Sequence, residues 1–170
     1  MADDHQSRRL EASIQRKSLS LIAGGNDVVQ THRGIARLLL KENMSPLTGG
    51  NRVELLVNGE LKFPRVLEAL KNAKNHINME TYSIEDDEVG RRFVDALVGQ
   101  QNQGVQVNLI YDSVGSGNTP AEFFQPLLSS GANVLEFNPL NPLALRKGWE
   151  VGRDHRKLLV VDGKVAFVGG

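Results

Sequence analysis

A run near the end of the sequence, DHRKLLVVDGKVAFVGG (154–170), combines residue types that can transfer a phosphoryl group. His155 and Lys157 are two residues apart, so on a strand they share a face, with Cα atoms about 7 Å apart. A neutral imidazole is a good nucleophile toward phosphorus near neutral pH, and an ammonium balances charge on phosphate oxygens. We therefore predict that a phosphate is held between these two side chains, while Arg156 points to the other face.

The same run predicts a β-hairpin. Asp162 and Gly163 lie between two apolar runs, and Asp-Gly is a strong signal for a two-residue hairpin turn. A two-residue turn pairs Val161 with Lys164 and so fixes the register of both strands.

In that register Gly169 and Gly170 lie across the ladder from Arg156 and His155. Glycines there leave open space in which a substrate can approach the backbone, so both are predicted to bind substrate. Asp162 sits in the turn, about 23 Å from His155 along an extended strand. Geometry therefore makes Asp162 a turn or anchoring residue rather than a group that touches the phosphate.

The elements that must position these residues follow an alternating rhythm from residue 52 onward. The expected fold is α/β, with a mixed, largely parallel sheet flanked by helices and ending in the hairpin. Residues 138–153 are expected to form a loop. Strands are predicted at 52–57, 76–84, 104–112 and 132–137, and helices at 63–73, 88–101 and 120–129.

Polar side chains occur where two of these strands end, at Glu80 and Tyr82 on one and at Asp112 on another. In open α/β sheets, groups at the carboxyl ends of strands tend to line the site. Glu80 is either a substrate-binding residue or a structural hydrogen-bond anchor, because an acid inside a strand needs a cleft or a partner. Asp112 either lies near the site or simply ends its strand.

Residues 1–48 differ from the rest and are predicted to be a polar, helical extension, with the main domain at 49–170. Val28, His32, Ile35 and Leu39 fall on one helical face. That helix either packs against its own domain or a missing partner, or lies on a lipid surface.

Composition excludes several classes of protein. The 170 residues contain 20 Lys and Arg against 20 Asp and Glu, so the formal net charge is zero and no nucleic-acid partner is expected. Without cysteine there is no disulfide, thiol nucleophile or thiolate metal site. No segment reaches the roughly 18–20 apolar residues of a membrane span, so any membrane contact is expected to be peripheral.

The pattern His155-x-Lys157, four residues, Asp162, six residues, Gly169-Gly170 resembles the HKD motif of the phospholipase D superfamily, HxKxxxxDxxxxxxGG. Together with METYSIEDDEVG and GVQVNLIYDSVGS, it makes residues 49–170 similar to the first half of bacterial cardiolipin synthases. The resemblance implies that His155 is a catalytic histidine, Lys157 a phosphate ligand and Asp162 the third signature residue. It implies no metal and no cofactor.

The resemblance also implies a reaction. A histidine attacks the phosphate of phosphatidylglycerol, a phosphatidyl-histidine forms, and a second phospholipid takes the phosphatidyl group. The expected protein is thus a transferase of phospholipid biosynthesis, peripheral on the cytoplasmic face of the cell membrane or cytoplasmic.

Relatives of this kind carry two such motifs, and this sequence has one. The expectation is a fragment whose second half comes in the same chain or from a homodimer. Two alternatives stay open, namely a phospholipase D-type phosphodiesterase or nuclease, and a catalytically inactive half-domain.

Overall fold

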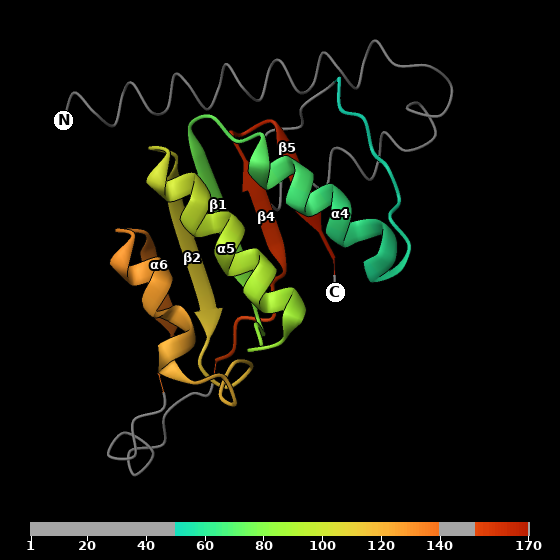
Figure 1. The fold of residues 1–170 in the computed structure, drawn as a ribbon. Helices are drawn as coiled ribbons and strands as arrows, with labels where there is room; N and C mark the ends of the chain where they lie inside the picture. Colours follow the sequence, from blue (N-terminus) through green and yellow to red (C-terminus); the bar gives the residue numbers. More distant parts are fainter. Residues whose placement is uncertain (1–49, 140–151, 170) are drawn as a thin grey trace, which may run out of the picture. The chain divides into compact units, whose positions relative to one another are not determined.

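Five strands form one mixed sheet in the part of the chain that the computed structural model describes, residues 50–139 and 152–169 (Figure 1). The strand order is β3-β2-β1-β4-β5. The strands are β1 (His76–Thr81), β2 (Gln106–Asp112), β3 (Asn133–Phe137), β4 (Leu158–Val161) and β5 (Val165–Val168). The helices are α4 (Asn58–Lys71), α5 (Glu88–Asn102) and α6 (Gln125–Ser129), with a short 3₁₀ helix, η1 (Ala121–Phe124), before α6.

The sheet is parallel on one side of β1 and antiparallel on the other. β1 pairs with β2 and β2 with β3 in parallel, because helical crossovers return the chain to the same edge. β4 pairs antiparallel with both β1 and β5. This confirms the expected mixed α/β sheet that ends in a hairpin.

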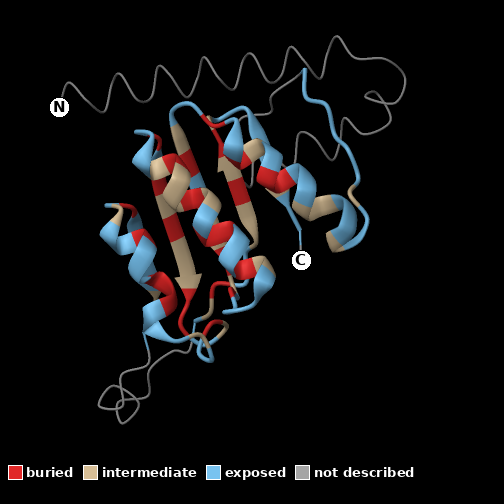
Figure 2. Ribbon diagram, viewed as in Figure 1, coloured by how far each residue is buried: buried red, intermediate tan, exposed pale blue. Residues whose placement is uncertain are grey.

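The described helices pack against one face of the sheet (Figure 1), and the core lies between these two layers. Helix α5 begins where Asp87 caps it by accepting a hydrogen bond from the Gly90 N–H at 2.7 Å. Its buried stripe includes Phe93 and Leu97, as its apolar spacing predicts. Figure 2 shows buried bands on the strands and exposed outer faces on the helices. The largest fully buried apolar side chains are Leu70, Ile77, Leu97, Val107, Leu109 and Leu127.

Two predicted elements differ substantially from the structure, and others differ at their ends, such as the strand predicted at 76–84, which ends at Thr81. Residues 52–57 form no strand, and Val53 and Leu55 are 92% and 85% exposed. Apolar alternation there indicated a strand, but a strand also needs a ladder partner, and none of the five strands pairs with these residues. Helix α4 starts at Asn58 rather than at residue 63, so Pro64 lies inside it instead of at its start.

The predicted register of the hairpin is wrong by one residue. Asp162 and Gly163 make the expected turn, with φ of 54° and 64°, and Lys164 N–H donates to the Val161 carbonyl at 3.0 Å. In the ladder, however, Val161 pairs with Val165. Lys164 is thus an extra residue in the connection, and every pair along the hairpin shifts.

The one-residue shift in the hairpin register changes which residues lie across from His155 and Lys157. Strand β4 begins at Leu158, so His155 and Lys157 lie in the extended segment just before it. Gly169 N–H donates to the Lys157 carbonyl at 3.2 Å, which places Gly169 across from Lys157 rather than from Arg156. Three predictions fall outside the described residues: the role of Gly170, the N-terminal extension at 1–48 and most of the loop at 138–153.

Candidate functional site

Three chain segments meet at one edge of the sheet. Because β1 and β2 run in parallel and β4 runs against β1, the carboxyl ends of β1 and β2 lie beside the start of β4. Tyr82 follows β1, Asp112 ends β2, and His155 precedes β4. This is the edge at which open α/β sheets build their sites.

His155 and Lys157 contact each other at this edge. Lys157 Nζ lies 3.0 Å from Nδ1 and 3.4 Å from Nε2 of His155, and it donates to the His155 carbonyl at 2.9 Å. A lysine ammonium can only donate, so the ring nitrogen that accepts from it carries a lone pair and no proton. His155 is exposed, so its ring and the adjacent ammonium are accessible to a substrate.

Tyr82 forms the wall behind this pair. Its ring centroid lies 4.6 Å from that of His155, with the ring planes tilted by 49°. Lys157 Nζ lies 5.4 Å from the same Tyr82 centroid, which is within cation–π range. One aromatic ring therefore restricts the positions of both side chains. Sequence reasoning placed Tyr82 at the strand end but missed this role.

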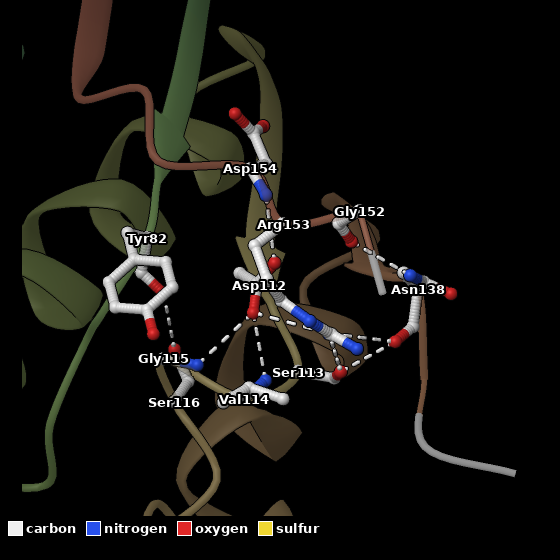
Figure 3. A network of polar contacts seen from close by, with 10 residues as sticks. All are labelled: Tyr82, Asp112, Ser113, Val114, Gly115, Ser116, Asn138, Gly152, Arg153 and Asp154. Atoms are coloured by element: carbon white, nitrogen blue, oxygen red, sulfur yellow. Dashed lines mark hydrogen bonds and ion pairs between the residues drawn. The ribbon is translucent and has the colours of Figure 1, made fainter. Parts of the chain in front are cut away.

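Gly115 holds Tyr82 from the other side. A Cβ at residue 115 would lie 2.1 Å from the Tyr82 carbonyl oxygen and 2.9 Å from its Cδ1, so only glycine fits there without a backbone shift. The close approach of the two segments is visible in Figure 3. The loop after β2 thereby supports the ring that contacts His155.

The Asp112 carboxylate ties the loop after β2 to the segment that carries His155. Oδ1 accepts from the N–H groups of Val114 (2.9 Å) and Gly115 (3.1 Å), while Oδ2 accepts from Asp154 N–H (2.9 Å) (Figure 3). Arg153 Nη1 lies 3.5 Å from Oδ1. Burial raises the pKa of Asp112, but the three N–H groups and Arg153 outweigh it and hold that pKa below its usual range. These are the contacts of a residue that anchors its strand end.

Arg153 extends the same network. Its Nη1 also donates to Ser113 Oγ at 3.0 Å and to the Asn138 carbonyl at 3.2 Å. Asn138 Nδ2 in turn donates to the Gly152 carbonyl at 2.8 Å (Figure 3). Residues on the two sides of 140–151 are therefore held together beside the site.

Glu80 lies in a second charged cluster, against the backbone that carries His155. Arg156 Nη2 contacts Glu80 Oε1 at 2.9 Å, and Arg156 Nε contacts Asp154 Oδ1 at 2.9 Å. A hydrogen bond to Asp154, then burial and the Asp154 charge, raise the pKa of Glu80 against the opposing effect of Arg156. The contacts are those of a structural anchor, and a contact between Glu80 and a substrate stays a prediction.

Asp162 anchors the far end of the hairpin, the role that its position in the turn indicates. Its carboxylate accepts from the backbone N–H groups of Lys74 (2.9 Å), Asn75 (2.8 Å) and His76 (3.1 Å), which lead into β1. The hydrogen bond from Asn75 N–H is the largest influence on the Asp162 pKa, and with the other two it outweighs burial and lowers that pKa. The third motif residue thus fixes β4 against β1.

We predict that Asp162→Ala lowers the thermal midpoint of unfolding, because three N–H groups lose their shared acceptor. Asp162→Asn keeps one carbonyl oxygen, so it is expected to fall between the parent chain and the alanine variant. Circular dichroism melts at neutral pH measure both. Lys164→Ala, in the same turn, is the control and should leave the midpoint nearly unchanged. An equal midpoint for Asp162→Ala and the parent would contradict the anchoring role.

The described ranges, 50–139 and 152–169, contain neither a cluster of metal ligands nor a helix that could span a membrane. No group of three or more His, Cys, Asp or Glu side chains in these ranges is arranged to hold a metal ion. No helix in them is long and apolar enough to cross a bilayer.

The fold and the paired histidine and lysine define an α/β protein with a candidate phosphoryl-transfer site. The family model for "Cardiolipin synthase, PLD-like domain" matches residues 66–170, which is more than half of the chain. The chain therefore belongs to this phospholipase D-like family, and the resemblance inferred from the motif is confirmed.

Individual relatives agree with the family. The chain is 36% identical over 141 residues to the major cardiolipin synthase ClsA of Bacillus subtilis, and this match covers 82% of the chain. It is 37% identical over 144 residues to the cardiolipin synthase of Listeria monocytogenes, with 84% of the chain covered. In each case the match covers 29% of the relative, so the chain spans less than a third of the length of these proteins. Among solved structures, a phospholipase D family member, Nuc from Salmonella typhimurium, is 25% identical over 58% of this chain and 56% of its own, with a TM-score of 0.41.

Proposed function

We propose that this chain provides one catalytic half of a cardiolipin synthase-like phosphatidyltransferase, with His155 as the nucleophile. The observation that carries the proposal is the contact between the His155 ring and Lys157 Nζ at 3.0 Å, in a chain that belongs to this family. An imidazole beside an ammonium suits attack on an anionic phosphodiester, because the imidazole can act as nucleophile and the ammonium can balance charge on the phosphate oxygens.

In the first step, an imidazole nitrogen of His155 attacks the phosphorus of phosphatidylglycerol. A P–N bond forms and the P–O bond to the headgroup glycerol breaks, so that glycerol leaves with a proton from a general acid. Lys157 turns from the ring to the phosphate oxygens and balances their charge. Tyr82 keeps the ring in place while the lysine moves, because it packs against His155 at 4.6 Å.

In the second step, the hydroxyl of a second phosphatidylglycerol attacks the phosphatidyl-histidine. Its oxygen forms a new P–O bond, the P–N bond to His155 breaks, and the hydroxyl proton passes to a general base. The product is cardiolipin, and the imidazole is restored.

The general acid and base are proposed to come from a second motif outside residues 1–170, in the same protein or in a second copy. Support comes from the share of the relatives that this chain covers, 29%. His76 is no candidate for this role, because it starts β1 at the opposite edge of the sheet from His155, which lies beyond the carboxyl end of β1. Because the substrates are lipids, we further propose that the protein works peripherally on the cytoplasmic face of the cell membrane.

The proposal predicts that the complete protein carrying this sequence converts labelled phosphatidylglycerol into cardiolipin and glycerol in mixed vesicles. Lys157→Ala should reduce the turnover by at least about a hundredfold, because the phosphate loses its counter-charge. Lys164→Ala removes a lysine from the same hairpin, away from the site, and should keep parental turnover. Release of phosphatidic acid instead of cardiolipin would identify a phosphodiesterase with water as acceptor. Equal turnover in the two lysine variants would contradict the proposed site.

A further inference from the structure

A cavity of about 400 Å³ lies directly beside Lys157. It is lined by residues of α4 (Lys62, Phe63 and Val66), of the start of α5, of β1 and the loop after it, and of the hairpin. The helices that contribute to it cover one face of the sheet (Figure 1). Its volume is within the roughly 300–1,000 Å³ typical of ligand pockets. Lys157 lines the cavity and also contacts His155, so the cavity borders the candidate catalytic pair.

The walls of the cavity are mostly apolar. Phe63, Met79, Val89 and Phe167 pack against the core but are only partly buried, so each leaves apolar surface facing this space. Phe93 lies behind them, with its ring edge-on to Phe63 at 6.0 Å. Such a surface binds hydrocarbon and offers little to a sugar, a free phosphate or a nucleotide.

The charged lining residues favour one orientation of a ligand. Of the three acids in the lining, Asp87 caps α5, Glu80 pairs with Arg156 and Glu85 is exposed, while the two cations are Lys62 and Lys157. Lys157, by contrast, lines the cavity and has its Nζ 3.0 Å from Nδ1 of His155. An anionic group is therefore favoured at Lys157, with an apolar body behind it.

We propose that this cavity binds one acyl chain of the phosphatidyl donor while its phosphate lies at His155 and Lys157. The inference rests on the proposed function, because it takes the substrate to be a phospholipid. Binding of the chain would place the phosphorus against the imidazole and would make the site discriminate between donors by chain length. A deacylated headgroup would bind weakly for the same reason.

The test is a binding measurement that needs no turnover. Lysophosphatidylglycerol with octanoyl, decanoyl and dodecanoyl chains, each below its micellar concentration, is titrated into the protein by calorimetry, with glycerophosphoglycerol as the chainless probe. We expect affinity to rise roughly tenfold for each two methylenes until the cavity is filled. Equal affinity for all the probes, or no binding of any, would overturn the proposal.

A matched pair of variants on α5 locates the binding. Val89→Trp fills the cavity and should remove the dependence on chain length, with at least a tenfold loss for the longest probe. Val98→Trp, at another partly buried position of the same helix that does not line the cavity, should retain it. If both variants lose it equally, or neither does, the cavity is not the binding site.

Two further measurements keep the result interpretable. A dodecanoyl probe with a terminal diazirine should crosslink to peptides containing Phe63 or Val89 in the unmodified protein. Crosslinks confined to other peptides would refute the proposal, and this test holds even if Val89→Trp fails to fold.

His155→Ala should bind the probes with the same dependence on chain length. If the unmodified complete protein showed this dependence but no phosphatidyl transfer, the result would count against the proposed function alone. If it transferred phosphatidyl groups but its binding did not depend on chain length, the result would count against the cavity alone.

Discussion

Replacing His155 with alanine is expected to lower phosphatidyl transfer by at least about a thousandfold, because the group that forms the covalent bond is gone. The side chain is exposed, so the change should leave folding nearly intact, and a circular dichroism melt close to that of the parent would show this. Turnover is measured as cardiolipin formed from labelled phosphatidylglycerol by the complete protein.

A second histidine provides the control for this experiment. His76→Gln changes a histidine at the opposite end of β1, and we expect it to keep turnover within a few-fold of the parent. Cardiolipin formation by His155→Ala at a rate near that of His76→Gln would contradict the catalytic assignment.

Replacing Asp112 with alanine is expected to reduce the free energy of unfolding by about 3–5 kcal/mol, the cost of removing one partner from a buried ion pair. The Asp112 side chain is 0% exposed, and its loss leaves the N–H groups of Val114, Gly115 and Asp154 without their acceptor and Arg153 without its counter-charge. Urea denaturation measures the change, and Asp112→Asn should give an intermediate value because it keeps one acceptor oxygen.

Asp86→Ala is the matched control for Asp112→Ala, since Asp86 pairs with Arg91 on the surface and should matter little to stability. If the two alanine variants were equally stable, the anchoring role of Asp112 would be wrong.

The Asp112 carboxylate makes the stability of the fold depend on pH, and the direction of its pKa shift gives the sign of that dependence. Because the folded-state pKa of Asp112 lies below its unfolded value of about 3.9, its contribution is fully present above that value. The contribution is lost as the pH falls through the folded-state pKa, when the carboxylate is protonated and its hydrogen bonds weaken. Stability should therefore decline below about pH 4, and less steeply in Asp112→Ala than in the parent.

The paired His155 and Lys157 could be predicted because both lie within one short segment. Their spacing places the two side chains on one side of an extended chain, and this holds although β4 begins only at Leu158. The role of Asp162 followed from the same local geometry. The register of the hairpin could not be predicted in this way. The Asp-Gly turn forms as expected, but Lys164 is an extra residue in the connection, so Val161 pairs with Val165.

Contacts between distant segments could not be predicted from local patterns. Tyr82 meets His155 only because β4 lies antiparallel to β1, and Gly115 supports Tyr82 only because β2 lies on the other side of β1. Residues 52–57 show the converse case. Their apolar alternation is a good local signal for a strand, but they form no strand because they have no ladder partner.

The most direct test of the proposed function is to trap the covalent intermediate. The complete protein is mixed with phosphatidylglycerol labelled at phosphorus and quenched at neutral or alkaline pH within one turnover, and its peptides are analysed by mass spectrometry. We predict a phosphatidyl group on His155, in the peptide that contains Arg156 and Lys157, and its absence in His155→Ala. Active protein that carries the label on a different residue, or forms cardiolipin with no labelled peptide, would contradict the proposed mechanism.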